Sequence, residues 1–147
     1  MTEVVQQAVS AEDDGPSLEF LACDIDVDTR TIWLGGIEDE TAEKFIKAMH
    51  VLTKESDFPI HILMNSAGGH WPNALDIYDC IKDAEVPVSI EVFGQCMSAA
   101  PVIVQACCYR WIHPNAVVMI HDGQHGGEGD TRTFVSWGKY ADVERKR

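Results

Sequence analysis

The spacing of apolar and polar residues divides this chain into alternating strands and helices. Short β-branched runs bounded by turn residues predict strands, and apolar residues at i, i+3, i+4 and i+7 predict helices. We expect strands at 18–23, 31–34, 60–64, 88–92, 109–112 and 116–120, with helices at 39–53, 71–83, 99–108 and at the end of the chain. Strands that alternate with helices of this length predict an α/β fold with parallel strands and right-handed crossovers.

Two of the predicted helices have a clear apolar face. The face of helix 39–53 consists of Ala42, Phe45, Ile46, Met49 and Leu52, and that of helix 71–83 of Ala74, Ile77, Tyr78 and Ile81. Between the first two strands, residues 24–28 alternate Asp with Ile and Val. This segment lacks the Gly and terminal Glu of a calcium loop, so we expect a half-exposed strand or hairpin there and no metal site.

Composition and charge restrict the class of protein. A length of 147 residues indicates one domain, and the net charge of -13 argues against nucleic acid or an anionic membrane as partner. The five cysteines have no zinc-like spacing, and we find no signal peptide and no apolar run long enough to span a membrane. We therefore expect a cytoplasmic protein with reduced thiols, an acidic, mobile segment at 1–17 and one domain at 18–147.

Three features fall where predicted strands end: the Gly68-Gly69 turn, Ser98 and His121. In parallel α/β sheets the carboxyl ends of the strands form the edge where ligands bind. Ser98 has two interpretations at this stage. It is either an N-cap, which satisfies a free backbone N–H at the start of a helix, or a nucleophile beside N–H groups that stabilise an oxyanion.

The same three features contain the groups that acyl transfer needs. A serine nucleophile requires a base and donors for the oxyanion. His121 is the best candidate for the base, although a histidine that merely ends a strand is the alternative. The Gly68-Gly69 turn presents backbone N–H groups without side chains. Cys96 is a rival nucleophile, but its position two residues before Ser98 predicts a thiol that points into the core.

Several spaced motifs resemble the proteolytic subunit of the Clp protease. They are Asn65-Ser66-Ala67-Gly68-Gly69, Ile77-Tyr78-Asp79, Gly94-Gln95-Cys96-Met97-Ser98, Pro114-Asn115 and Met119-Ile120-His121. They follow one another in the family's order over residues 18–147. The resemblance implies a crotonase-like α/β fold and a serine endopeptidase.

Carried over to this sequence, the family's site gives each residue a role. Ser98 is the nucleophile and His121 the general base, and the backbone N–H groups of Gly69 and Ala99 form the oxyanion hole. The peptide groove would be lined by Gly68, Gly123, Gly126 and Gly127, with the substrate added as an extra strand.

The resemblance also implies partners. The last helix would be the start of the family's handle helix, which joins two heptameric rings into a closed chamber. The rings would be homo-oligomers, or mixed rings with complete subunits. A separate AAA+ unfoldase would spend ATP to supply unfolded polypeptide, because this chain has no phosphate loop of its own. We expect no cofactor in this chain.

One part of the family's triad has no match. The orienting Asp of the family follows the handle helix, and Asp122, Asp130 and Asp142 do not occupy its position, so we expect a domain that is incomplete at its C-terminus. A non-catalytic ring subunit is therefore an alternative. Two further alternatives are a Lys base at Lys82 or Lys139, and an acyl-CoA enzyme of the crotonase type; the Ser98 and His121 motifs favour the peptidase over both.

Overall fold

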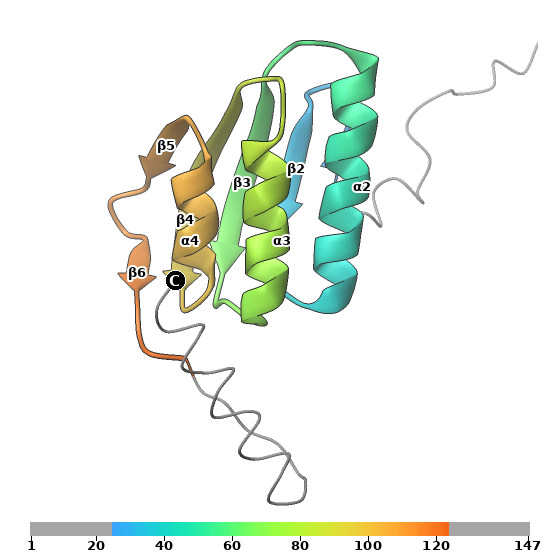
Figure 1. Ribbon diagram of the computed structural model, residues 1–147. Coiled ribbons are helices and arrows are strands. Elements are labelled where there is room, and N and C mark those ends of the chain that lie inside the picture. Colours follow the sequence, from blue (N-terminus) through green and yellow to red (C-terminus); the bar gives the residue numbers. More distant parts are fainter. Residues whose placement is uncertain (1–24, 124–147) are drawn as a thin grey trace, which may run out of the picture.

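The structure is a computed structural model that describes residues 25–123. The elements are β1 (Ile25–Asp26), β2 (Thr31–Leu34), α2 (Asp39–Glu55), β3 (Ile60–Ser66), α3 (Trp71–Lys82), β4 (Val88–Met97), α4 (Ala100–Ala106), β5 (Tyr109–Ile112) and β6 (Val117–Met119) (Figure 1). Strands and helices alternate through most of this range, which confirms the predicted α/β class.

The sheet is mostly parallel and has the order β1-β2-β3-β4-β5, with β6 also paired to β4. The short β1 is antiparallel to β2, so the alternating Asp segment forms a hairpin, as predicted. β4 pairs first with β5 and then, further along, with β6. Because Cys96 pairs with Ser66 of β3 and also with Val118 of β6, β6 lies on the same edge of β4 as β5.

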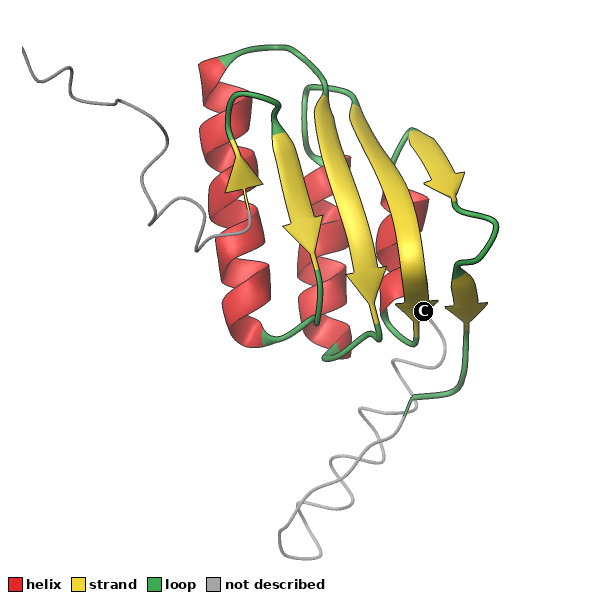
Figure 2. Ribbon diagram, turned by 180° about the vertical axis from the view of Figure 1, so that it is seen from behind, coloured by secondary structure: helices red, strands yellow, loops and turns green. Residues whose placement is uncertain are grey.

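The helices of the described range, α2, α3 and α4, lie on one face of the sheet (Figures 1 and 2). The core forms between this face and the helices, because the crossovers between parallel strands bring the apolar side of each helix onto the sheet. Its fully buried side chains include Leu34, Met49, Leu52, Ile60, Ile62, Met64, Ile77, Ile90, Val92 and Ile103. No helix within residues 25–123 has the length and apolar character needed to cross a membrane.

Several predicted details differ from the structure or lie outside it. β4 runs five residues beyond the predicted end at Val92, and the helix predicted at 99–108 spans only Ala100–Ala106. Ile46 is 39% exposed, because the buried face of α2 is centred instead on Phe45 and Met49. The segment 1–17, the strand at 18–23 and the last helix fall outside the described residues.

Arg30 joins the start of β2 to the end of α2. Its guanidinium donates to the carbonyl oxygens of Leu52 at 2.9 Å, Ser56 at 3.1 Å, Phe58 at 2.9 Å and Pro59 at 3.3 Å. Arg30 is 9% exposed, and it ties the segment that follows α2, together with the Leu52 carbonyl near the end of the helix, to the start of β2. A planar guanidinium with five donors suits four separate acceptors.

We predict that Arg30→Met lowers the free energy of unfolding by about 3 kcal/mol, because one buried and three partly buried carbonyls lose a charged hydrogen-bond donor. Chemical denaturation measures the difference. Arg110→Met is the matched control, since Arg110 is exposed and its one described bond, to Gln105, is exposed too; we expect a change within about 0.5 kcal/mol. Equal losses in the two variants would contradict this role of Arg30.

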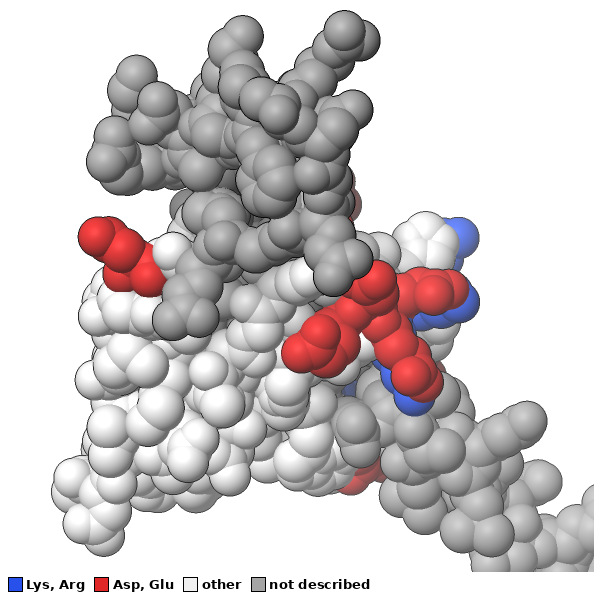
Figure 3. All heavy atoms as spheres, turned by 90° about the horizontal axis from the view of Figure 1, so that it is seen from below, with Lys and Arg blue, Asp and Glu red and all other residues white. Residues whose placement is uncertain are grey.

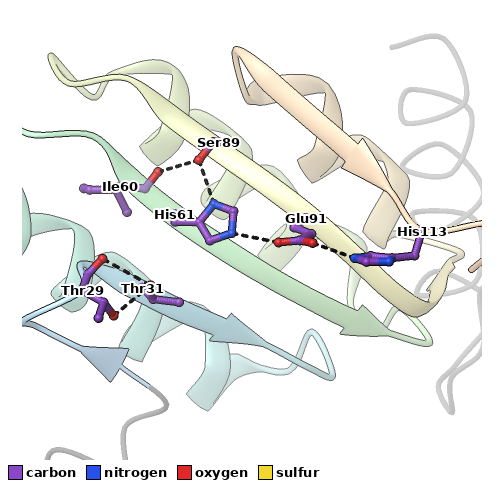
Figure 4. A network of polar contacts seen from close by, with 7 residues as sticks. All are labelled: Thr29, Thr31, Ile60, His61, Ser89, Glu91 and His113. Atoms are coloured by element: carbon purple, nitrogen blue, oxygen red, sulfur yellow. Dashed lines mark hydrogen bonds and ion pairs between the residues drawn. The ribbon is translucent and has the colours of Figure 1, made fainter.

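The sheet face opposite the helices carries a polar cluster of His61, Ser89, Glu91 and His113 (Figure 4). The Glu91 carboxylate lies between two imidazoles, 2.6 Å from Nε2 of His113 and 3.3 Å from Nε2 of His61. Nδ1 of His61 contacts the Ser89 hydroxyl at 2.8 Å. The hydrogen bond with His113, together with that with His61, holds the pKa of Glu91 below its usual range. His61 is thus a half-buried, hydrogen-bonded strand residue.

We predict that Glu91→Gln changes how stability depends on pH. Because folding lowers the pKa of Glu91, its ionised form stabilises the fold above the unfolded pKa, and this contribution is lost as pH falls from about 5 to 3. The difference in free energy of unfolding between parent and Glu91→Gln should therefore shrink over that window. Glu55→Gln is the control, since the Glu55 side chain is exposed and forms no hydrogen bond or ion pair with residues 25–123. Parallel pH curves for parent and Glu91→Gln would refute the prediction.

Candidate active site

Ser98 lies at the carboxyl end of β4, in the short turn that leads into α4. The N-cap of α4 is Ala99, so the interpretation of Ser98 as an N-cap is wrong. Ser98 has φ of +57°, in the left-handed region. A non-glycine residue in that conformation costs free energy, and such strain is concentrated at functional sites. The sharp strand-to-helix turn holds the hydroxyl at the end of the sheet.

The pairing of β6 with β4 places His121 next to Ser98. The Ser98 N–H donates to the Met119 carbonyl at 2.9 Å, which continues the ladder that joins Met97 to Met119. His121 follows two residues later, and its Nε2 lies 2.8 Å from the Ser98 Oγ. The structure therefore brings together the two side chains that the sequence named from separate strand ends, at the distance of a hydrogen bond.

The Gly68-Gly69 turn packs directly on the Ser98 segment. Gly68 has φ of +97°, and a Cβ there would lie 2.6 Å from both the Ser98 Cβ and the Met97 carbonyl oxygen. Only glycine allows this approach. The Gly68 N–H donates to the buried Ser66 hydroxyl at 3.1 Å, and Ile37 forms an isolated parallel bridge with Gly69. These contacts hold the turn against the serine.

Two backbone N–H groups near Ser98 are free of partners within residues 25–123. They belong to Gly69 and Ala99, and neither donates to a described group. A Cβ on Gly68 would lie 3.1 Å from the Ala99 nitrogen, so the Gly68-Gly69 turn is beside Ala99. Of the predicted groove residues, Gly68 lies at Ser98 and Gly123 is exposed. Gly126 and Gly127 fall outside the described residues.

Cys96 is not in a position to attack a substrate. Its side chain is 1% exposed, and burial raises the pKa of the thiol to about 11. A buried thiol of raised pKa is almost entirely protonated at neutral pH and therefore a poor nucleophile. The prediction that Cys96 points into the core is confirmed.

The described structure also tests the alternative bases and acids. α3 begins two residues after Gly69 and ends at Lys82, so Lys82 lies about 16 Å along the helix from the site edge. Lys139, Asp130 and Asp142 are outside the described residues. Among residues 25–123, no carboxylate hydrogen-bonds to His121, and Asp122 makes no described contact with it. The group that orients the imidazole is thus not found in the described range.

The edge that contains the site is acidic on the α2 side. Seen from below, Asp and Glu side chains gather there beside a few Lys or Arg side chains (Figure 3). The first turn of α2 contains Asp39 and Glu40. Hydrogen bonds from Asn73 at 2.8 Å and from His70 hold the pKa of Asp39 below its usual range. Within residues 25–123, no three or more His, Cys, Asp or Glu side chains are placed so that they could hold a metal ion together.

An α/β fold with a serine and a histidine in hydrogen-bond contact at the carboxyl edge of the sheet is an arrangement that serine hydrolases use. Residues 24–137 match the model of the family described as Clp protease. The chain therefore belongs to the Clp protease family, as the motifs indicated.

Similar proteins agree with this assignment. The "ATP-dependent Clp protease proteolytic subunit 2" of Pseudomonas aeruginosa is 30% identical over 97 residues, and the corresponding subunit of Carsonella ruddii is 36% identical over 95 residues. These alignments cover 65% and 63% of this chain but 48% and 49% of the relatives, so the chain spans about half their length.

Solved structures agree as well. A point mutant of ClpP1 from Listeria monocytogenes superposes with a TM-score of 0.73 at 31% identity, and covers 81% of this chain and 67% of that one. ClpP1 itself gives 0.65 at 33% identity, over 76% and 66% of the two chains. The likeness extends from local motifs to the arrangement of the elements.

We predict that Gly68→Ala lowers the free energy of unfolding by about 3 kcal/mol, because the added methyl overlaps the Ser98 segment and the backbone has positive φ. Gly36→Ala is the matched control, since a Cβ at Gly36 meets nothing within 4 Å, and its effect should stay within about 0.5 kcal/mol. Denaturant titration of both variants measures this. A Gly68→Ala variant as stable as Gly36→Ala would refute the packing described.

Proposed function

We propose that this chain is a serine endopeptidase subunit of an ATP-dependent Clp-type protease. The observation that carries the proposal is the 2.8 Å contact between the Ser98 Oγ and the His121 Nε2. Membership of the Clp protease family and the strained backbone of Ser98 support it. The substrate would be unfolded polypeptide, cleaved to short peptides.

In the proposed reaction, Nε2 of His121 takes the proton of the Ser98 hydroxyl as Oγ attacks the scissile carbonyl carbon. The N–H groups of Gly69 and Ala99 receive the oxyanion that forms. His121 then gives the proton to the leaving amine, and the peptide bond breaks to leave an acyl-serine ester. Water, deprotonated by His121, attacks this ester, and the acid product leaves as Oγ regains its proton.

The partners in this proposal are further copies of the chain or complete subunits, in heptameric rings that stack, and an AAA+ unfoldase that hydrolyses ATP. The exposed edge of the sheet supports assembly. Apolar side chains of β5 and β6 are open to solvent, with Trp111 65% and Val117 52% exposed. Large apolar side chains exposed along a sheet edge are typical of a protein contact. The chain itself would need no cofactor.

A second candidate function is a non-catalytic ring subunit. It is favoured by one observation, the lack of a carboxylate on His121 among residues 25–123. Loss of the orienting acid lowers turnover by about 10⁴ in serine proteases. The peptidase proposal thus requires a group outside the described range to hold Nδ1 of His121.

Labelling with a fluorophosphonate, followed by intact mass, separates the two. We expect the full chain to gain one label and Ser98→Ala to gain none. His121→Ala should react at least about 100-fold more slowly, because it lacks the general base. Cys96→Ala is the matched control; it removes the rival thiol and should label within about twofold of the parent.

The opposite result has a clear meaning. If the parent stays unlabelled while a complete Clp subunit reacts in the same assay, the peptidase proposal fails and the non-catalytic ring subunit is favoured. Label that persists in Ser98→Ala would assign the reaction to another residue.

A further inference from the structure

The pairing of β3 with β4 is interrupted immediately before the nucleophile. The two strands pair in register up to Met64 and Val92, and pairing resumes at Ser66 and Cys96. This takes two steps along β3 but four along β4, so β4 contains a bulge at Phe93 to Gln95. A bulge leaves backbone groups without ladder partners, and those groups need another partner.

The side chain of Asn65 supplies that partner. Its Oδ1 accepts the N–H of Gln95 at 3.1 Å. Gly94 has φ of +55°, and a Cβ on it would lie 2.8 Å from the same oxygen, so the backbone of β4 closes tightly around the Asn65 amide. Asn65 is itself exposed. Its side chain therefore acts on the bulge and contributes little to the core.

The bulge is also where β4 changes partner on its other edge. β4 pairs with β5 up to Val92 and Ile112, and with β6 from Gln95 and Val117 onward. The β6 register sets the Ser98 N–H bond to Met119 and hence the place of His121. Gln95 is the first residue of β4 that pairs with β6, and this ladder leads to the Ser98–His121 contact. The conformation of Gln95 therefore affects where His121 lies.

We propose that Asn65 is a positioning residue for the Ser98–His121 pair. It accepts the Gln95 N–H, holds the bulge in one conformation, and so fixes the register of β4 against β6. This inference rests on the proposed function, because it assigns a role in the same reaction. Asn65 does not touch the reacting atoms and takes no proton.

The test compares Asn65→Ala, Asn65→Asp and Gln95→Ala in the full chain. Asn65→Ala removes the acceptor, and Asn65→Asp replaces the amide oxygen with a carboxylate oxygen that can still accept the Gln95 N–H. Gln95→Ala is the matched control, because it keeps the main-chain N–H and removes only an exposed side chain. Fluorophosphonate labelling rate, hydrogen exchange of a peptide covering 94–99, and hydrolysis of a fluorogenic peptide are measured for each.

We expect Asn65→Ala to label about 10- to 100-fold more slowly, since small displacements of reacting groups have effects of this size. Its 94–99 peptide should exchange faster, while peptides from α2 exchange as in the parent. For hydrolysis, kcat should fall and KM should stay near the parent value. Asn65→Asp and Gln95→Ala should remain within about threefold of the parent.

Two results would overturn the inference. One is Asn65→Ala with parental labelling and exchange. The other is an increase in exchange throughout the sheet and α2, with no recovery in Asn65→Asp, which would make Asn65 a general stability residue. If the parent does not label at all, the proposed function fails separately. In that case the hydrogen-exchange rate of the 94–99 peptide is compared between Asn65→Ala and Asn65→Asp. Faster exchange in Asn65→Ala alone would still show that Asn65 holds the Ser98 segment.

Discussion

The pairing of β4 with three other strands is the constraint on which the rest of the structure depends. Its first half is in register with β3 and β5, and its second half with β3 and β6. A serine and a histidine 23 residues apart meet because the β4–β6 ladder, from Gln95 and Val117 onward, continues to the Ser98 N–H bond with Met119. Backbone hydrogen bonds, which must be satisfied in a buried sheet, therefore set the geometry of the candidate site more directly than contacts between side chains do.

The turn before α3 and the turn before α4 form one packed unit at the carboxyl edge of the sheet. Gly68 lies against the Ser98 Cβ, and the Ser66 hydroxyl holds the Gly68 N–H. The close approach explains why a glycine and a strained serine occur at neighbouring strand ends. It also separates Ser98 from an ordinary helix cap, because the hydroxyl is directed to His121 and the cap position belongs to Ala99.

Much of the fold follows from local pattern. The strand at 31–34 and the start of α2 at Asp39 agree with the predicted positions. Runs of β-branched residues and i, i+3, i+4 spacing predict such elements well, because they depend on which residues of a single element are buried. Predictions were wrong where distant segments decide. β4 continues past Val92 because β3 and β6 supply partners on either side of it, and Ile46 is exposed because the buried face of α2 is centred on Phe45 and Met49.

The sequence by itself determined the alternation of strands and helices, the family, and the identity of Ser98, His121 and the Gly68-Gly69 turn as features at strand ends. Only the tertiary structure decided that these features meet, since a contact between Oγ and Nε2 depends on strand register and not on the spacing of residues. The importance of Asn65 also became visible only in three dimensions. An asparagine in a strand-end motif has no distinguishing pattern, whereas a side-chain acceptor for an N–H that the bulge leaves without a ladder partner on β3 has a defined physical role.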